Sequence, residues 1–134
     1  MLNKLEHVGI AVKDLSIASS LYQALLGVQS YKQEEVASEN VTTEFFKVGN
    51  TKIELLAATN EKSTILKFIE KKGEGIHHLA FEVDDIYIEM ERLKKEGFIL
   101  LNDEPKKGAD NKLICFVHPK SAHGVLIELC QEIT

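Results

Sequence analysis

The chain has 134 residues and a net charge of −5, with 44% hydrophobic and 28% charged residues. This length fits one compact domain or two small modules that share a core, and the composition is typical of a globular protein. The acidic balance argues against general nucleic-acid binding, and no apolar run approaches the roughly 18–20 residues of a membrane span. The N-terminus runs directly into a patterned strand, unlike a signal peptide, so we expect a cytoplasmic protein.

The first half of the chain predicts a strand, a helix and three further strands. The stretch LEHVGIAVKDL at 5–15 is strand-like, and Asp14 stands where the N-cap of the next helix is expected. Apolar residues then recur at helical spacing until Gly27 ends the helix: Leu15, Ala18, Leu21, Tyr22 and Leu25. The strand-like runs VQSYKQEEV, VTTEFFKVG and TKIELLAA follow, with Gly49-Asn50 as a tight turn between the last two.

The second half repeats this order. A linking helix is predicted in STILKFIEKKG at 63–73, and IHHLAFEVDDI at 76–86 then aligns with residues 5–15, so that His7 meets His78 and Asp14 meets Asp85. The helical pattern of DIYIEMERLKKEG is followed by the strand-like runs FILLN, KLICFVHP and GVLIELCQE. The last strands of the two halves also match, because IEL around Glu54 resembles IEL around Glu128.

The order βαβββ, written twice, predicts an α+β fold. One four-stranded module would expose a sheet face, so the two modules must pair to bury it, and we expect a curved, cup-shaped mixed sheet. We therefore predict a single domain over residues 1–134, with modules at about 1–60 and 75–134 and a linker helix at about 61–74.

Four ionisable residues occupy matching places in the two halves: His7, His78, Glu54 and Glu128. A carboxylate inside an apolar strand is costly unless it is paired or binds a metal, whereas in a half-exposed sheet these residues would simply face water. Their duplication favours a site for a divalent cation such as Co, Ni, Zn or Mn.

Three other histidines fit the site less well. His77 points to the opposite face of its strand from His78, because strand side chains alternate. His118 and His123 flank the loop HPKSAHG, where we expect loop or rim positions. Cys115 and Cys130 lie on predicted strands and are expected to be buried thiols, without a Cys-x-x-Cys zinc motif.

Together, LEHVGIAVKDL, KIELLAAT, GEGIHHLAFEVDDI, LLNDEPKKGADNKLICFVHPKS and GVLIEL resemble the vicinal-oxygen-chelate superfamily and, within it, the methylmalonyl-CoA epimerases. The resemblance covers most of the chain and implies the metal ligands His7, Glu54, His78 and Glu128, with cobalt as the first candidate. It also implies a homodimer that acts on an acyl-CoA by proton abstraction at C2, through a metal-stabilised enolate.

The chain departs from the family at the expected catalytic base. Many members carry glutamine at the position of Glu54 and a glutamate at the position of Thr43, whose hydroxyl is not a base near neutral pH. Two acid/base groups are needed on opposite faces of the substrate, and Glu54 and Glu128 fit this role. Glu44 remains an alternative base only if a β-bulge turns it towards Glu54.

Lysines near the expected mouth of the cup are candidates for binding coenzyme A. Lys106, Lys107 and Lys120, with Ser121, lie in the loops concerned, although ordinary solvated lysines would look the same. Two rival functions stay open within the superfamily. One is glyoxalase I, which isomerises a glutathione hemithioacetal, and the other is a non-catalytic ligand-binding module.

Overall fold

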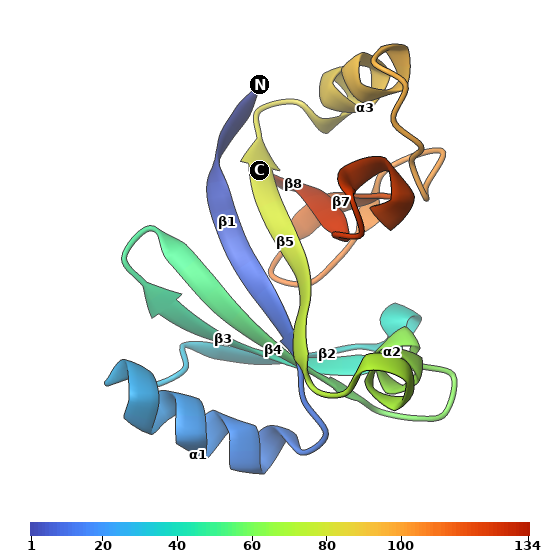
Figure 1. Ribbon diagram of the computed structural model, residues 1–134. Coiled ribbons are helices and arrows are strands. Elements are labelled where there is room, and N and C mark those ends of the chain that lie inside the picture. Colours follow the sequence, from blue (N-terminus) through green and yellow to red (C-terminus); the bar gives the residue numbers. More distant parts are fainter. The chain divides into compact units, whose positions relative to one another are not determined.

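The computed structural model describes residues 1–134, and its elements follow the order β1-α1-β2-β3-β4-α2-β5-α3-β6-β7-β8, with two short 3-10 helices (Figure 1). This order confirms the predicted pair of βαβββ modules. The chain divides into two compact units, one of residues 7–77 and the other of residues 1–6 with 78–134. Every helix is too short or too polar to cross a lipid bilayer.

The unit of residues 7–77 contains a four-stranded sheet in the order β2-β3-β4-β1. β2 pairs antiparallel with β3, β3 pairs antiparallel with β4, and β1 runs parallel to β4. A turn at Gly49, whose φ of 61° suits glycine, joins β3 to β4. The strands are β1 (Leu2–Ala11), β2 (Lys32–Val36), β3 (Val41–Val48) and β4 (Thr51–Ala58).

Two helices cover opposite faces of this sheet. α1 (Leu15–Leu26) begins at Asp14, whose carboxylate accepts the Ile17 N–H at 3.0 Å, and ends at Gly27 in the left-handed conformation. It packs on the face that carries Phe46 and Leu55, and Figure 1 shows α1 alongside β3 and β4. α2 (Thr64–Lys72) instead packs on the face that carries Leu56.

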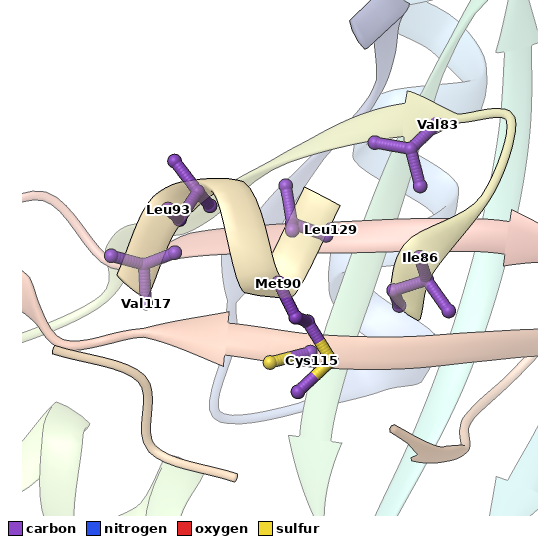
Figure 2. Close-up of a cluster of buried hydrophobic side chains, with 7 residues drawn as sticks. All are labelled: Val83, Ile86, Met90, Leu93, Cys115, Val117 and Leu129. Carbon is purple, nitrogen blue, oxygen red and sulfur yellow. The ribbon is translucent and has the colours of Figure 1, made fainter. Parts of the chain in front are cut away.

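The other unit contains the order β5-β8-β7-β6, with β5 parallel to β8. Its elements are β5 (Gly75–Val83), α3 (Ile86–Lys95), β6 (Lys106–Lys107), β7 (Lys112–Val117) and β8 (Ile127–Glu132). Figure 2 shows α3 lying over β7 and β8, with its side chains directed at those strands. The buried cluster consists of Val83, Ile86, Met90, Leu93, Cys115, Val117 and Leu129.

The prediction of a strand in FILLN, residues 98–102, is wrong. Within it only Leu100 forms a bridge, to Val117, and the regular edge strand β6 lies further on, at 106–107. The Phe116 N–H of β7 donates to the Asn102 side-chain oxygen at 2.9 Å rather than to a backbone carbonyl. A polar side chain therefore replaces the backbone as the hydrogen-bond partner of β7 at this point.

Candidate functional site

His7 and Glu54 form a buried pair in the unit of residues 7–77. β1 and β4 are parallel with Gly9 opposite Glu54, so His7, two positions before Gly9, shares the face of Glu54. His7 Nε2 lies 3.3 Å from Glu54 Oε1, and the two residues are only 5% and 4% exposed. Burial at this level requires that the carboxylate be paired or bound to a cation.

His78 and Glu128 form the corresponding pair in the other unit. β5 and β8 are parallel with Ala80 opposite Glu128, which again puts the histidine two positions away on the same face. The Nε2–Oε1 distance is 3.4 Å, and the two residues are 3% and 6% exposed. The Phe116 ring stands edge-on to His78, with 6.0 Å between the ring centroids.

The sequence repeat is therefore also a repeat of strand register. Phe45 lies opposite Glu54 across β3 and β4, and Phe116 lies opposite Glu128 across β7 and β8. Each phenylalanine lies on the same sheet face as its glutamate, and the sequence analysis identified neither phenylalanine as part of the site. The signal was present, because Phe45 and Phe116 are separated by the same offset as the two histidines.

Glu44 lies on the opposite face from Glu54. β3 pairs with β4 residue for residue from Val41 to Val48, so the bulge that would redirect Glu44 is absent. Its partner across the ladder is Leu55, on the α1 side of the sheet, and its Oε2 accepts a hydrogen bond from Ser19 Oγ at 2.9 Å. The structure therefore does not bring Glu44 together with the His7–Glu54 pair.

Thr43 lies on the same face of the sheet as Glu54, but its hydroxyl is hydrogen-bonded to the backbone of β2. Its side chain is almost fully buried, and its hydroxyl donates to the Glu34 carbonyl at 3.3 Å. A threonine held in this way is not a proton acceptor, so this position supplies no base.

The remaining histidines have structural surroundings. His77 packs edge-on against Phe68 of α2, with 4.9 Å between ring centroids. His118 Nδ1 accepts the Lys120 N–H at 3.0 Å and caps the 3-10 helix that follows, and His123 is exposed in the left-handed conformation. These contacts agree with their predicted placement away from the ligand set.

The two neighbouring lysines of β6 face opposite sides of the sheet. Lys106 lies opposite Ile114, which is two positions before the residue paired with Glu128, so Lys106 shares the face of Glu128. Lys107 lies opposite Leu113, on the other face. Both are exposed, but only Lys106 belongs to the candidate site's side of this unit.

Lys120 and Ser121 belong to the short 3-10 helix Pro119–Ala122. The Lys120 side chain is exposed. Ser121 Oγ accepts the Ile99 N–H at 3.0 Å, which ties this helix to the segment before β6.

Each His/Glu pair presents one imidazole nitrogen and one carboxylate oxygen within 3.4 Å of each other in buried surroundings. Nitrogen and carboxylate donors suit a divalent ion of the Mn to Zn series. The donor chemistry thus fits the metal that the sequence predicts.

Comparison with known proteins places the chain among characterised relatives. Residues 6–116 match the Glyoxalase/Bleomycin resistance protein/Dioxygenase superfamily. The ethylmalonyl-CoA/methylmalonyl-CoA epimerase of Cereibacter sphaeroides is 43% identical over 133 residues, which cover 98% of this chain and 99% of that protein.

Solved structures give the same result. The crystal structure of methylmalonyl-CoA epimerase from Mycobacterium tuberculosis is 36% identical, with a TM-score of 0.95 over 99% of this chain and 90% of that one. A variant of the Streptomyces coelicolor methylmalonyl-CoA epimerase, in complex with 2-nitronate-propionyl-CoA, is 33% identical, with a TM-score of 0.96 over 100% and 97% of the two chains.

Proposed function

Since the chain belongs to the glyoxalase/bleomycin-resistance superfamily and, within it, to the methylmalonyl-CoA epimerases, we propose that it interconverts (R)- and (S)-methylmalonyl-CoA. The observation that carries the proposal is the buried His/Glu pair found at the equivalent strand register in each module. Near-full-length identity of 43% to an enzyme named for this activity supports the substrate.

The proposed metal ligands are His7, Glu54, His78 and Glu128, two from each module. Both pairs are buried, and each holds a nitrogen and an oxygen donor at close range, a donor set that suits a divalent ion. Cobalt is the first candidate, with nickel, zinc and manganese as alternatives. Such an ion would stabilise the negative charge of the enolate as a Lewis acid.

Epimerisation removes the C2 proton from one face of the substrate and returns a proton to the other face. Glu54 and Glu128 are the proposed acid/base groups, because each is a buried carboxylate on the same sheet face as its module's histidine. One carboxylate accepts the C2 proton, and the other donates a proton to the opposite face. Each carboxylate lies 3.3 or 3.4 Å from its histidine and would loosen from the metal on substrate binding to exchange a proton.

Coenzyme A is the proposed ligand of Lys106, Lys120 and Ser121. Lys106 is favoured over Lys107 because it shares the face of Glu128. Exposed lysines contribute to phosphate binding by an attraction that salt screens.

We also propose a cytoplasmic homodimer in which residues 1–134 form one domain. The cytoplasmic location is supported by Cys115 and Cys130, which are both free thiols, as expected in a reducing compartment. 

The test is exchange of the C2 hydrogen of methylmalonyl-CoA for deuterium in D₂O, followed by NMR. We expect exchange by the metal-loaded enzyme, its loss on chelation and its recovery on addition of Co²⁺. His78→Ala should abolish exchange and weaken metal binding, whereas His77→Ala, changed at the adjacent residue on the other face of β5, should retain both.

Two outcomes would contradict this function. Turnover of the glutathione hemithioacetal without C2 exchange would identify a glyoxalase I. Equal binding of acyl-CoA by metal-loaded and metal-free protein, with no exchange in either, would identify a binding module.

A further inference from the structure

The sheet face that carries His7 and Glu54 is covered by α2 at one end of its strands. α2 packs on Leu56, which follows Glu54 by two positions on β4 and is 7% exposed. Residues two apart on a strand share a face and lie about 7 Å apart along it. A long ligand held at Glu54 can therefore extend along β4 only away from α2, towards the turn that joins β3 to β4.

Two lysines lie next to each other in that direction. Lys52 precedes Glu54 by two positions on β4 and shares its face, and Lys47 of β3 is the residue directly opposite Lys52. Like charges directly opposite each other destabilise a sheet, and an anion bound between the two ammonium groups would offset that repulsion. A third lysine of this face, Lys32, pairs with Glu34 at 3.3 Å. The pair of Lys47 and Lys52 is thus the part of this face best suited to an anion.

Tyr31 positions the Lys52 ammonium over this face. The Tyr31 N–H donates to the Phe45 carbonyl at 3.0 Å, and its ring lies 5.9 Å from the Phe45 ring, centroid to centroid. The Lys52 ammonium is 5.8 Å from the centre of the Tyr31 ring, within the range of a cation–π interaction. Because Phe45 lies directly opposite Glu54, these contacts place the lysine on the side of the sheet where Glu54 pairs with its histidine.

The second module has no such pair of lysines. At the offsets that align the glutamates and the phenylalanines of the two modules, Lys52 corresponds to Leu126 and Lys47 corresponds to His118. The His118 Nδ1 accepts a backbone N–H of the 3-10 helix that follows it. The repeated strand register therefore does not require two lysines, which belong to the first module alone in a chain with a net charge of −5.

We propose that Lys47 and Lys52 bind a phosphate group of an acyl-CoA whose acyl end lies at the His7–Glu54 pair. The proposal rests on the proposed function, which supplies the acyl-CoA. Lysine binds phosphate well because its ammonium is a compact charge on a flexible stem. Coenzyme A carries a diphosphate and a ribose 3′-phosphate, so this pair and the lysines already proposed for coenzyme A can bind different groups.

Calorimetric titration of the metal-loaded protein with propionyl-CoA tests the site. We expect Lys52→Ala to weaken binding about fivefold and the double variant Lys47→Ala/Lys52→Ala about 20-fold, whereas Lys52→Arg keeps the charge and stays within about twofold of the wild type. Lys67→Ala is the matched control, because it removes one positive charge from an exposed position on α2 of the same unit, and it should change the affinity less than about twofold. The effect of Lys52→Ala should disappear at about 1 M salt.

Shortened ligands identify the group that is bound. S-propionyl-pantetheine has no phosphate, so the wild type and Lys52→Ala should bind it equally. With propionyl-3′-dephospho-CoA, a retained effect of Lys52→Ala assigns the contact to the diphosphate, and a lost effect assigns it to the 3′-phosphate. Lys47→Ala removes the like-charge pair and should not lower the midpoint of urea unfolding, which separates a binding role from a structural one.

Three results would overturn the proposal: equal affinities of Lys52→Ala and Lys67→Ala for propionyl-CoA, an equal loss with S-propionyl-pantetheine, or failure of Lys52→Arg to restore binding. If any of them is found while the wild type exchanges the C2 hydrogen of methylmalonyl-CoA, the phosphate site is wrong and the epimerase function stands. Lysine-dependent binding of propionyl-CoA without C2 exchange would instead support the phosphate site and contradict the epimerase function.

Discussion

Replacing Glu54 with glutamine should lower the rate of C2 hydrogen exchange by about 10²–10⁴-fold, the usual contribution of a general acid or base. Glutamine has nearly the same volume, so the side chain, 4% exposed and 3.3 Å from His7, should stay in place. The change removes the proton acceptor while leaving the packing of β4 intact. A 10²-fold loss corresponds to about 2.7 kcal/mol of transition-state free energy.

Glu44→Gln is the matched control. Glu44 is also a buried carboxylate of the same sheet, but it lies on the α1 face and accepts a hydrogen bond from Ser19 at 2.9 Å. The glutamine oxygen can accept the same bond, so we expect a stability change below about 1 kcal/mol and little change in turnover.

The assay is single-turnover exchange at C2 in D₂O with each variant fully loaded with Co²⁺, so that loss of metal is separated from loss of the base. If Glu54→Gln retains near-normal exchange while Glu44→Gln abolishes it, the assignment of the base to Glu54 is wrong. Glu44 would then have to reach the substrate through a rearrangement of β3.

Lys106→Ala should raise the KM for methylmalonyl-CoA about two- to fivefold at low salt, while Lys107→Ala, on the other face, should not. Equal effects of the two variants would refute the proposal that Lys106 rather than Lys107 binds coenzyme A. Burial raises the pKa of the Cys115 and Cys130 thiols, so an aromatic disulfide reagent at pH 8 should label neither in the native protein and both after unfolding. Rapid labelling of the native chain would contradict that burial. Asp14→Ala removes the N-cap of α1 and should lower the free energy of unfolding by about 1 kcal/mol in urea titrations, whereas Asp14→Asn should restore most of it. A loss as large for asparagine as for alanine would show that the cap is not the cause.

Local patterns were sufficient to predict the elements that have strong periodicity and clear ends. The helix after Asp14 and the strand TKIELLAA were predicted because side-chain alternation, caps and glycine stops are encoded within a few residues. FILLN failed because an apolar run alone does not show whether backbone carbonyls or a side chain such as Asn102 will complete the ladder.

The sequence alone determined the duplication, and with it the choice of His7, Glu54, His78 and Glu128, because a repeat is visible without any knowledge of how strands pair. Only the tertiary structure decided which face each side chain occupies. It turned Glu44 towards Ser19, and it separated Lys106 from Lys107.

The tertiary structure also buried Lys112 between Glu6, at 4.0 Å, and Glu132, at 3.7 Å, a contact that no local pattern predicts. The physical reason is that strand pairing joins residues far apart in the chain, and a shift of one residue in register moves every side chain of a strand to the other face of the sheet.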